Sequence, residues 1–117
     1  MLAAALLFAA VAAGAFGAHA LKARLAPDAM VAYHTAVQYH FWHGLGLLAV
    51  GILLLHKPDS VPLAVAAWLF AAGIALFSGS LYALALTGVR SLGAVTPVGG
   101  VAFLGGWAVL AWAAWRW

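Results

Sequence analysis

Three histidines are the residues whose type and spacing most readily suggest chemistry in this sequence. His40 and His43 are three residues apart, so on an α-helix both imidazoles share a side with Tyr39 and can point together. His19 comes from a separate apolar stretch. Imidazoles without thiols suit copper, zinc, nickel or haem iron. We therefore treat His19, His40 and His43 as candidate metal or haem ligands, or as members of a proton relay.

A second interpretation gives the same histidines a structural role. The pattern His-x-x-His is a weak indicator of metal binding, and no Asp or Glu lies nearby to orient the rings, as ligating histidines usually require. We favour this interpretation, in which the imidazoles form hydrogen bonds with Ser, Tyr or backbone carbonyls of neighbouring helices, or contact lipid headgroups. The other polar candidates in the same half of the chain's apolar segments are Tyr39, Ser78, Tyr82 and Thr96.

Helical spacing sorts the remaining polar side chains. Ser78 and Tyr82 share a helix face at i, i+4, whereas Ser80 points elsewhere and is expected to bond to its own helix backbone. His34 falls about 180° from His43 on a continuous helix and is expected outside the cluster. His56 stands beside Lys57 in a loop and is expected to face solvent or headgroups.

The elements that must position these residues follow from the distribution of charge. Only 6% of the 117 residues are charged and 68% are hydrophobic. The charges leave four long uncharged stretches, at residues 1–21, 29–56, 60–89 and 91–115. Because a helix needs about 20 apolar residues to cross a bilayer, we predict an all-α membrane protein with four transmembrane helices in a small bundle. It would be a single domain over 1–117, with spans at about 2–21, 36–55, 62–86 and 97–115.

The second span is preceded by residues that also suit a helix. Pro27 and Asp28 are typical of a helix start, and no proline follows before Leu55. Such a helix would be about 43 Å long at 1.5 Å per residue, longer than the hydrocarbon core of about 30 Å. Residues 27–35 are therefore expected either to lie in the headgroup region or to separate as a short interfacial helix.

The N-terminal stretch resembles a signal peptide only at its end. Ala18-His19-Ala20 imitates a cleavage site, but no positive charge precedes the apolar run. We interpret this stretch as the first transmembrane helix.

The orientation follows from the loops. Four spans place the segments 22–35 and 87–96 on one side of the membrane, and that side carries the larger share of the Lys and Arg residues. The positive-inside rule then predicts that both segments are cytoplasmic. We expect the membrane to be the bacterial cell (inner) membrane. Trp112, Trp115 and Trp117 with Arg116 are expected to anchor the end of the fourth helix at the membrane interface.

Composition also excludes several classes of function. The absence of cysteine excludes disulfides, iron–sulfur clusters, thiolate metal sites and cysteine nucleophiles. The five basic residues are scattered, unlike those of a nucleic-acid-binding protein. Ser78 and Ser80 have no Asp or Glu to complete a catalytic triad. We expect no nucleic-acid partner and, on balance, no enzyme.

Four motifs appear in order along the chain: Gly14-Ala-Phe-Gly-Ala-His-Ala-Leu-Lys22, Tyr39-His40-Phe-Trp-His43, Phe77-Ser-Gly-Ser-Leu-Tyr82, and Thr96-Pro-Val-Gly-Gly100 followed by Gly106-Trp107. Their combination closely resembles the domain-of-unknown-function 423 family of small membrane proteins. The resemblance covers about residues 14–107. It implies a four-helix integral membrane protein and no established activity.

Three hypotheses for function remain open. We favour a structural or accessory membrane module whose partners are the lipid bilayer and further copies of itself, because the helices carry stripes of small residues such as Ala10, Gly14, Ala18 and Ala75, Gly79, Ala83. The alternative is a metal- or haem-binding redox protein that uses His19, His40 and His43. A channel or proton-coupled carrier is disfavoured, since half of the bundle lacks polar side chains and no span holds an acidic residue.

Overall fold

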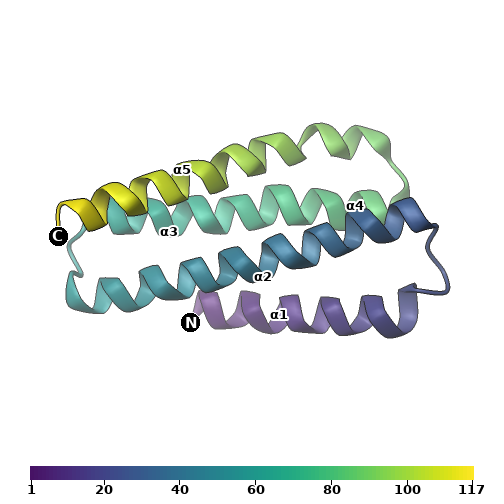
Figure 1. Ribbon diagram of the computed structural model, residues 1–117, viewed down its shortest axis with the longest axis horizontal. Helices are drawn as coiled ribbons and strands as arrows, with labels where there is room; N and C mark the ends of the chain where they lie inside the picture. Colours follow the sequence, from purple (N-terminus) through teal and green to yellow (C-terminus); the bar gives the residue numbers. More distant parts are fainter.

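The computed structural model describes residues 1–117 and consists of helices joined by short connections (Figure 1). Four helical segments are long and apolar enough to span a membrane. The first is α1 (Leu2–Phe16), continued by the π-helical turn η1 (Gly17–Leu21); the second is α2 (Pro27–His56). The third joins α3 (Val61–Gly73), the π-helical turn η2 (Ile74–Ser78) and α4 (Gly79–Thr87). The last is α5 (Thr96–Trp115), which follows the 3-10 turn η3 (Arg90–Ala94).

Local sequence sets the ends of these helices. Pro27 occupies the first turn of α2, where its missing N–H costs nothing. The Ser60 hydroxyl accepts a hydrogen bond from the Leu63 N–H at 3.5 Å and caps α3. Gly88 ends α4 with a left-handed φ of 72°, a conformation that favours glycine.

The helix α2 is continuous from Pro27 to His56. Of the two alternatives expected for residues 27–35, the structure has the uninterrupted one, and no separate interfacial helix forms. The third segment departs from a plain α-helix, because η2 inserts a π-helical turn that ends at Ser78. Such turns are rare and often occur at functional sites.

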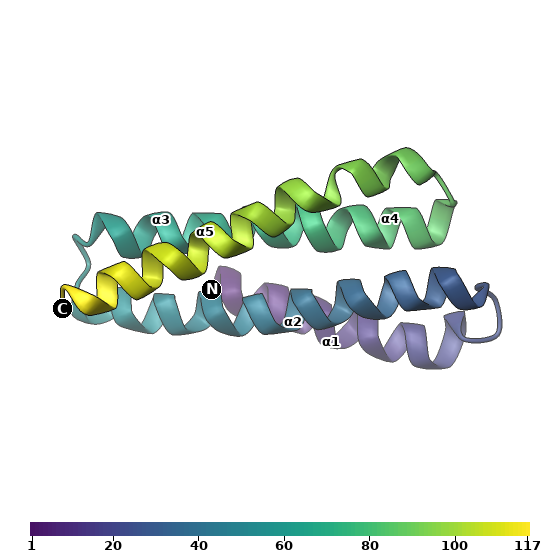
Figure 2. The same ribbon diagram turned by 45° about the horizontal axis from the view of Figure 1, so that its top comes forward.

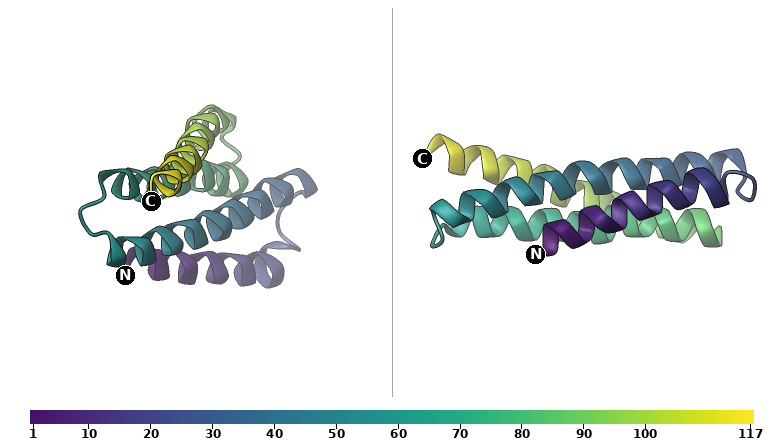
Figure 3. Two further views of the ribbon diagram at one scale, coloured as in Figure 1. Left: turned by 60° about the vertical axis from the view of Figure 1, so that its left-hand side comes forward. Right: turned by 90° about the horizontal axis from the view of Figure 1, so that it is seen from below.

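The four segments form two helical hairpins that pack side by side (Figure 2). One hairpin is α1 with α2, and the other is α3, η2 and α4 with α5. They meet where α2 packs against α3, η2 and α4, so α1 lies on the far side of α2 from α5 (Figure 3). The result is a flattened bundle of 48 × 26 × 17 Å. Figure 1 places the α1–α2 and α4–α5 connections at one end, with the α2–α3 connection and the C-terminus at the other.

The second hairpin is held together by interlocking glycine and phenylalanine residues. Each pair places a glycine of one helix against a phenylalanine of the other; the pairs are Phe70 with Gly106, Gly73 with Phe103, and Phe77 with Gly99. A Cβ atom at Gly106 would lie 2.7 Å from Phe70 Cε1. At Gly99 it would collide with the Phe77 backbone. The Phe103 ring at Gly73, the Phe70 ring at Gly106 and the Phe77 backbone at Gly99 occupy the space that any larger residue would need, which fixes the register of the two helices.

Candidate functional site

Polar side chains of α2 and α4 meet across the boundary between the two hairpins. The Tyr82 hydroxyl lies 3.1 Å from Nδ1 of His40, in hydrogen-bond contact. Four residues earlier, at the end of η2, the Ser78 hydroxyl donates to the Ala36 carbonyl at 2.8 Å. The Ala36 carbonyl points towards the C-terminus of α2, and the His40 side chain leans towards its N-terminus. Both groups therefore lie at about the same level of the helix, where η2 and α4 pass. Together they form a polar seam between the hairpins.

The other nitrogen of His40 completes no hydrogen bond. Nε2 is fully buried without a partner, and the side chain is only 6% exposed. The Leu6 backbone lies beside the ring without completing a bond to this atom. An unsatisfied buried polar group costs about 1–3 kcal/mol. Burying His40 therefore gains the contact with Tyr82 at Nδ1 and incurs the cost of an unpaired nitrogen at Nε2.

Tyr33 ties α1 to the same seam. Its hydroxyl donates to the Ala13 carbonyl at 2.6 Å, and its ring packs edge-on against Tyr82 with centroids 5.3 Å apart. The close approach depends on Gly17, because a Cβ there would collide with the Tyr33 ring. Sequence reasoning missed Tyr33, although its spacing of seven residues from His40 places both on one face of α2.

A separate contact joins α4 to α5. The hydroxyls of Ser80 and Thr96 lie 2.6 Å apart, and Ser80 also donates to the Phe77 carbonyl at 2.9 Å. The second bond is the one predicted from helical spacing. Thr96 is half-buried, so this contact closes the end of the hairpin nearest the α4–α5 connection.

His43 and Tyr39 form a different environment on the α5 side of α2. Nδ1 of His43 donates to the Tyr39 carbonyl at 2.8 Å, and the imidazole stacks on Phe103 with centroids 3.5 Å apart and planes at 11°. Tyr39 stacks in turn on Phe77 at 4.5 Å. These residues line an open groove of about 390 Å³ together with Trp107 and residues near the start of α5.

The structure does not bring the three candidate ligands together. His19 is exposed on η1, whereas His40 and His43 are buried and diverge towards different neighbours. No three His, Cys, Asp or Glu side chains are close enough to hold a metal ion. The divergence arises because His40 faces α4 and His43 faces α5, even though the two share one side of α2.

The remaining histidines lie outside both clusters. His34 is exposed, on the opposite side of α2 from His43 as helical spacing indicated. Nδ1 of the exposed His56 donates to the Ile52 carbonyl of its own helix at 3.1 Å.

The aromatic walls of the groove were not predicted as site residues. Phe77 and Trp107 occur within the motifs that carry the family resemblance, but Phe103 has no polar atom to draw attention. The available signal was the spacing of glycines on the facing helix, because a glycine inside a helix often marks the close approach of a neighbour. Phe103 lies against Gly73 for this reason.

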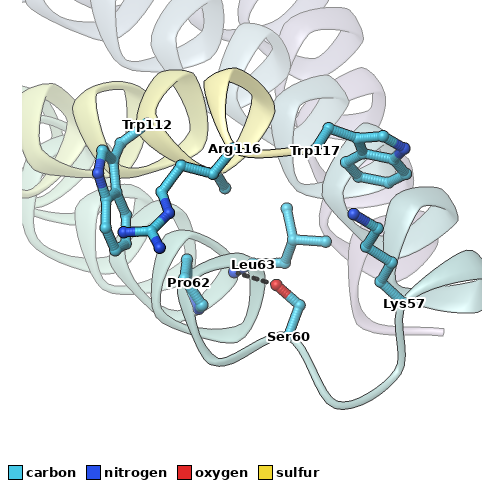
Figure 4. Close-up of a pocket in the computed structure, with 8 residues that line it drawn as sticks. Lys57, Ser60, Pro62, Leu63, Trp112, Arg116 and Trp117 are labelled. Atoms are coloured by element: carbon cyan, nitrogen blue, oxygen red, sulfur yellow. Dashed lines mark hydrogen bonds between the residues drawn. The ribbon is translucent and has the colours of Figure 1, made fainter.

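A second hollow lies at the opposite end of the molecule, where the C-terminus meets the α2–α3 connection (Figure 4). Its volume is about 290 Å³. The Lys57 ammonium lies 4.0 Å from the centre of a Trp117 ring, and the Arg116 guanidinium lies 5.1 Å from Trp112. Cations over indole rings suit the headgroup level of a membrane, where one end of the residue is apolar and the other wet.

Four long apolar helices, with their polar contacts directed inward between them, define a small multi-pass membrane protein. A family model described as protein of unknown function (DUF423) matches residues 13–100. This chain belongs to that family.

The relatives are bacterial membrane proteins. A UPF0382 membrane protein of Staphylococcus epidermidis is 52% identical over 101 residues, which cover 86% of this chain and 81% of the relative. The UPF0382 membrane protein YwdK of Bacillus subtilis is 47% identical over 105 residues, covering 90% and 85%. No solved structure matches the chain. The chain is accordingly a multi-pass membrane protein, as its bacterial relatives are membrane proteins, and the predicted fold class and family are confirmed.

Proposed function

We propose that this protein is a structural or accessory membrane module that associates with further copies of itself through one face of the α3–α4 segment. Its internal polar contacts support a structural role. The seam bonds at His40 and Ser78 connect helices of the same chain, and so does the bond at Tyr33. Side-chain groups used in this way hold a bundle together and leave its outer faces to meet lipid or other helices.

The stripe of Ala75, Gly79 and Ala83 is the observation that carries the self-association. Ala75 is exposed, and a Cβ at Gly79 would have only an oxygen of its own helix, at 4.0 Å, within reach. A small-residue stripe without a partner lets another helix approach closely, which is how helices associate in membranes. The stripe on α1 differs, because Ala10 is buried and a Cβ at Gly14 would already lie 3.3 Å from Val37.

The test compares two glycine substitutions in the full chain. Gly79→Leu would fill the stripe, and Gly51→Leu places the same side chain at an equally open position on α2. Mass measurement in lipid nanodiscs is expected to give an oligomer for the native protein and for Gly51→Leu, and a monomer for Gly79→Leu. A monomeric native protein, or an oligomer that persists in Gly79→Leu, would overturn the proposal.

A further inference from the structure

We propose that the groove between α2, η2 and α5 binds a lipid-soluble molecule with a hydroxylated aromatic ring, whose hydroxyl donates a hydrogen bond to Nε2 of His43. The groove is lined by the aromatic residues and histidine Tyr39, His43, Phe77, Phe103 and Trp107, and by Pro97, Gly100, Val101 and Leu104 of α5. This binding site is independent of self-association, because the α5 side of the molecule carries the groove and the Ala75, Gly79, Ala83 stripe does not contribute to it.

The hydrogen bond of the imidazole fixes which nitrogen is available. Nδ1 of His43 lies 2.8 Å from the Tyr39 carbonyl, and a carbonyl can only accept, so Nδ1 carries the proton. In the neutral ring, Nε2 is then an acceptor with a free lone pair. The ligand must therefore supply a donor at this point.

No group of the chain satisfies that acceptor. The His43 side chain is only 6% exposed, and its Nε2 has no hydrogen-bond partner. Unlike Nε2 of His40, this atom is not completely buried. The groove is the hollow that His43 lines. The Tyr39 hydroxyl also makes no hydrogen bond within the chain and belongs to the same wall. The residues that line the groove thus include an imidazole acceptor and a phenol hydroxyl that have no partner within the chain.

The walls specify the rest of the ligand. The stacked rings of His43 and Phe103 and of Tyr39 and Phe77 present aromatic faces and edges, which favour a further planar ring. A volume of about 390 Å³ is enough for one substituted ring. No Lys, Arg, Asp or Glu lines the groove, and Val101 and Leu104 at its rim are exposed on the apolar surface of α5. A neutral ligand would enter from the bilayer.

The test uses a matched pair of probes, decyl hydroquinone and its dimethyl ether, with the native protein in nanodiscs. Only the first has hydroxyl donors, and a single neutral hydrogen bond corresponds to about a fivefold change in affinity. We expect saturable binding with about a fivefold preference for the hydroquinone over the ether. Absence of saturable binding, or equal affinity for the two probes, would overturn the proposal.

Two variants and one spectroscopic measurement locate the donor contact. His43→Phe keeps a ring against Phe103 but loses the acceptor, so the preference should fall to about one. His34→Phe makes the same change at an exposed position of the same helix and should retain it. In native protein with nitrogen-15-labelled histidine, the hydroquinone should shift the Nε2 resonance of His43 and the ether should not. A preference that survives in His43→Phe, or an unmoved resonance, counts against the site whatever the stability of the variant.

Discussion

Individual polar atoms of α2 are found in two different bonding states. The Ala36 carbonyl accepts a hydrogen bond from Ser78 of η2, and Nδ1 of His40 contacts the Tyr82 hydroxyl of α4. By contrast, Nε2 of His43 has no partner although it lies only one turn further along the helix. The difference comes from the neighbouring helix, since η2 and α4 offer hydroxyls at this level and α5 offers phenylalanine and tryptophan. Only the first state contributes directly to holding the hairpins together.

Ser78→Ala should destabilise the fold, because it removes the bond that crosses to the Ala36 carbonyl. Hydrogen bonds between membrane helices average about 0.6 kcal/mol and reach about 1.7 kcal/mol. We expect a loss near the upper value, since Ser78 is fully buried. Unfolding in mixed detergent micelles would measure the change in free energy.

The matched control is Thr35→Val, which also removes a hydroxyl bonded to a backbone carbonyl. Thr35 donates to Val31 of its own helix at 3.0 Å, so no contact between helices is lost. Equal effects of the two substitutions would contradict a stabilising role for the seam.

Residue spacing alone could predict part of this site. It placed Ser78 and Tyr82 on one face of their helix, and both do bond to α2. It also grouped Tyr39, His40 and His43, but could not divide them between two neighbouring helices. That division depends on how α4 and α5 are placed around α2, which no local pattern encodes.

At the scale of the helices, register is fixed by steric fit rather than by charge. The pairs between Phe70 and Gly106, Gly73 and Phe103, and Phe77 and Gly99 follow one another at matching intervals on antiparallel helices. Sliding one helix past the other by a turn would place the Phe103 ring against Phe70 or Phe77 instead of Gly73. The same arrangement positions Phe77 and Phe103 as walls of the groove.

Gly99→Ala is expected to be strongly destabilising, because its new methyl group would collide with the Phe77 backbone, which cannot move away. Overpacking of this kind typically costs about 1–3 kcal/mol. Gly106→Ala should cost less, since the Phe70 side chain it meets can shift. Thermal unfolding in detergent would rank the variants.

Gly51→Ala provides the reference for this series. Nothing lies within 4 Å of a Cβ at Gly51, and alanine is favoured over glycine in a helix by up to about 1 kcal/mol. This variant should be as stable as the native protein or more so. A loss of stability at Gly51 as large as that at Gly99 would show that helix packing is not the cause.

The sequence was enough to predict that four helices form and where several of them end. It did not predict where a helix departs from regular α-helical geometry. Long uncharged stretches indicated four apolar helices, and Pro27, Ser60 and Gly88 mark ends by well-understood chemistry. The π-helical turn at Ile74–Ser78 has no such marker. The turn ends at Ser78, whose bond to α2 is a tertiary contact that no local pattern encodes.

For the whole molecule, the loop charges lead us to propose that the α1–α2 and α4–α5 connections are cytoplasmic. The native chain has no cysteine, so single cysteines report cleanly on each side. Ser91→Cys and Pro58→Cys are both at exposed positions of connections at opposite ends of the bundle. In spheroplasts, an impermeant maleimide should label Cys at position 58 directly and at position 91 only after lysis. The reverse pattern would invert the topology.

The division into two hairpins has a consequence for how the protein is made. Each hairpin consists of neighbours in the chain, so α1 and α2 can pair before α3 has been synthesised. The contacts from Ser78 and Tyr82 to α2 can form only once the second half has entered the membrane. Biogenesis would then proceed as the insertion of two preassembled units followed by their lateral docking. In that order of events, the contacts of Ser78 and Tyr82 with α2 would form last, and only where the two hairpins have paired correctly.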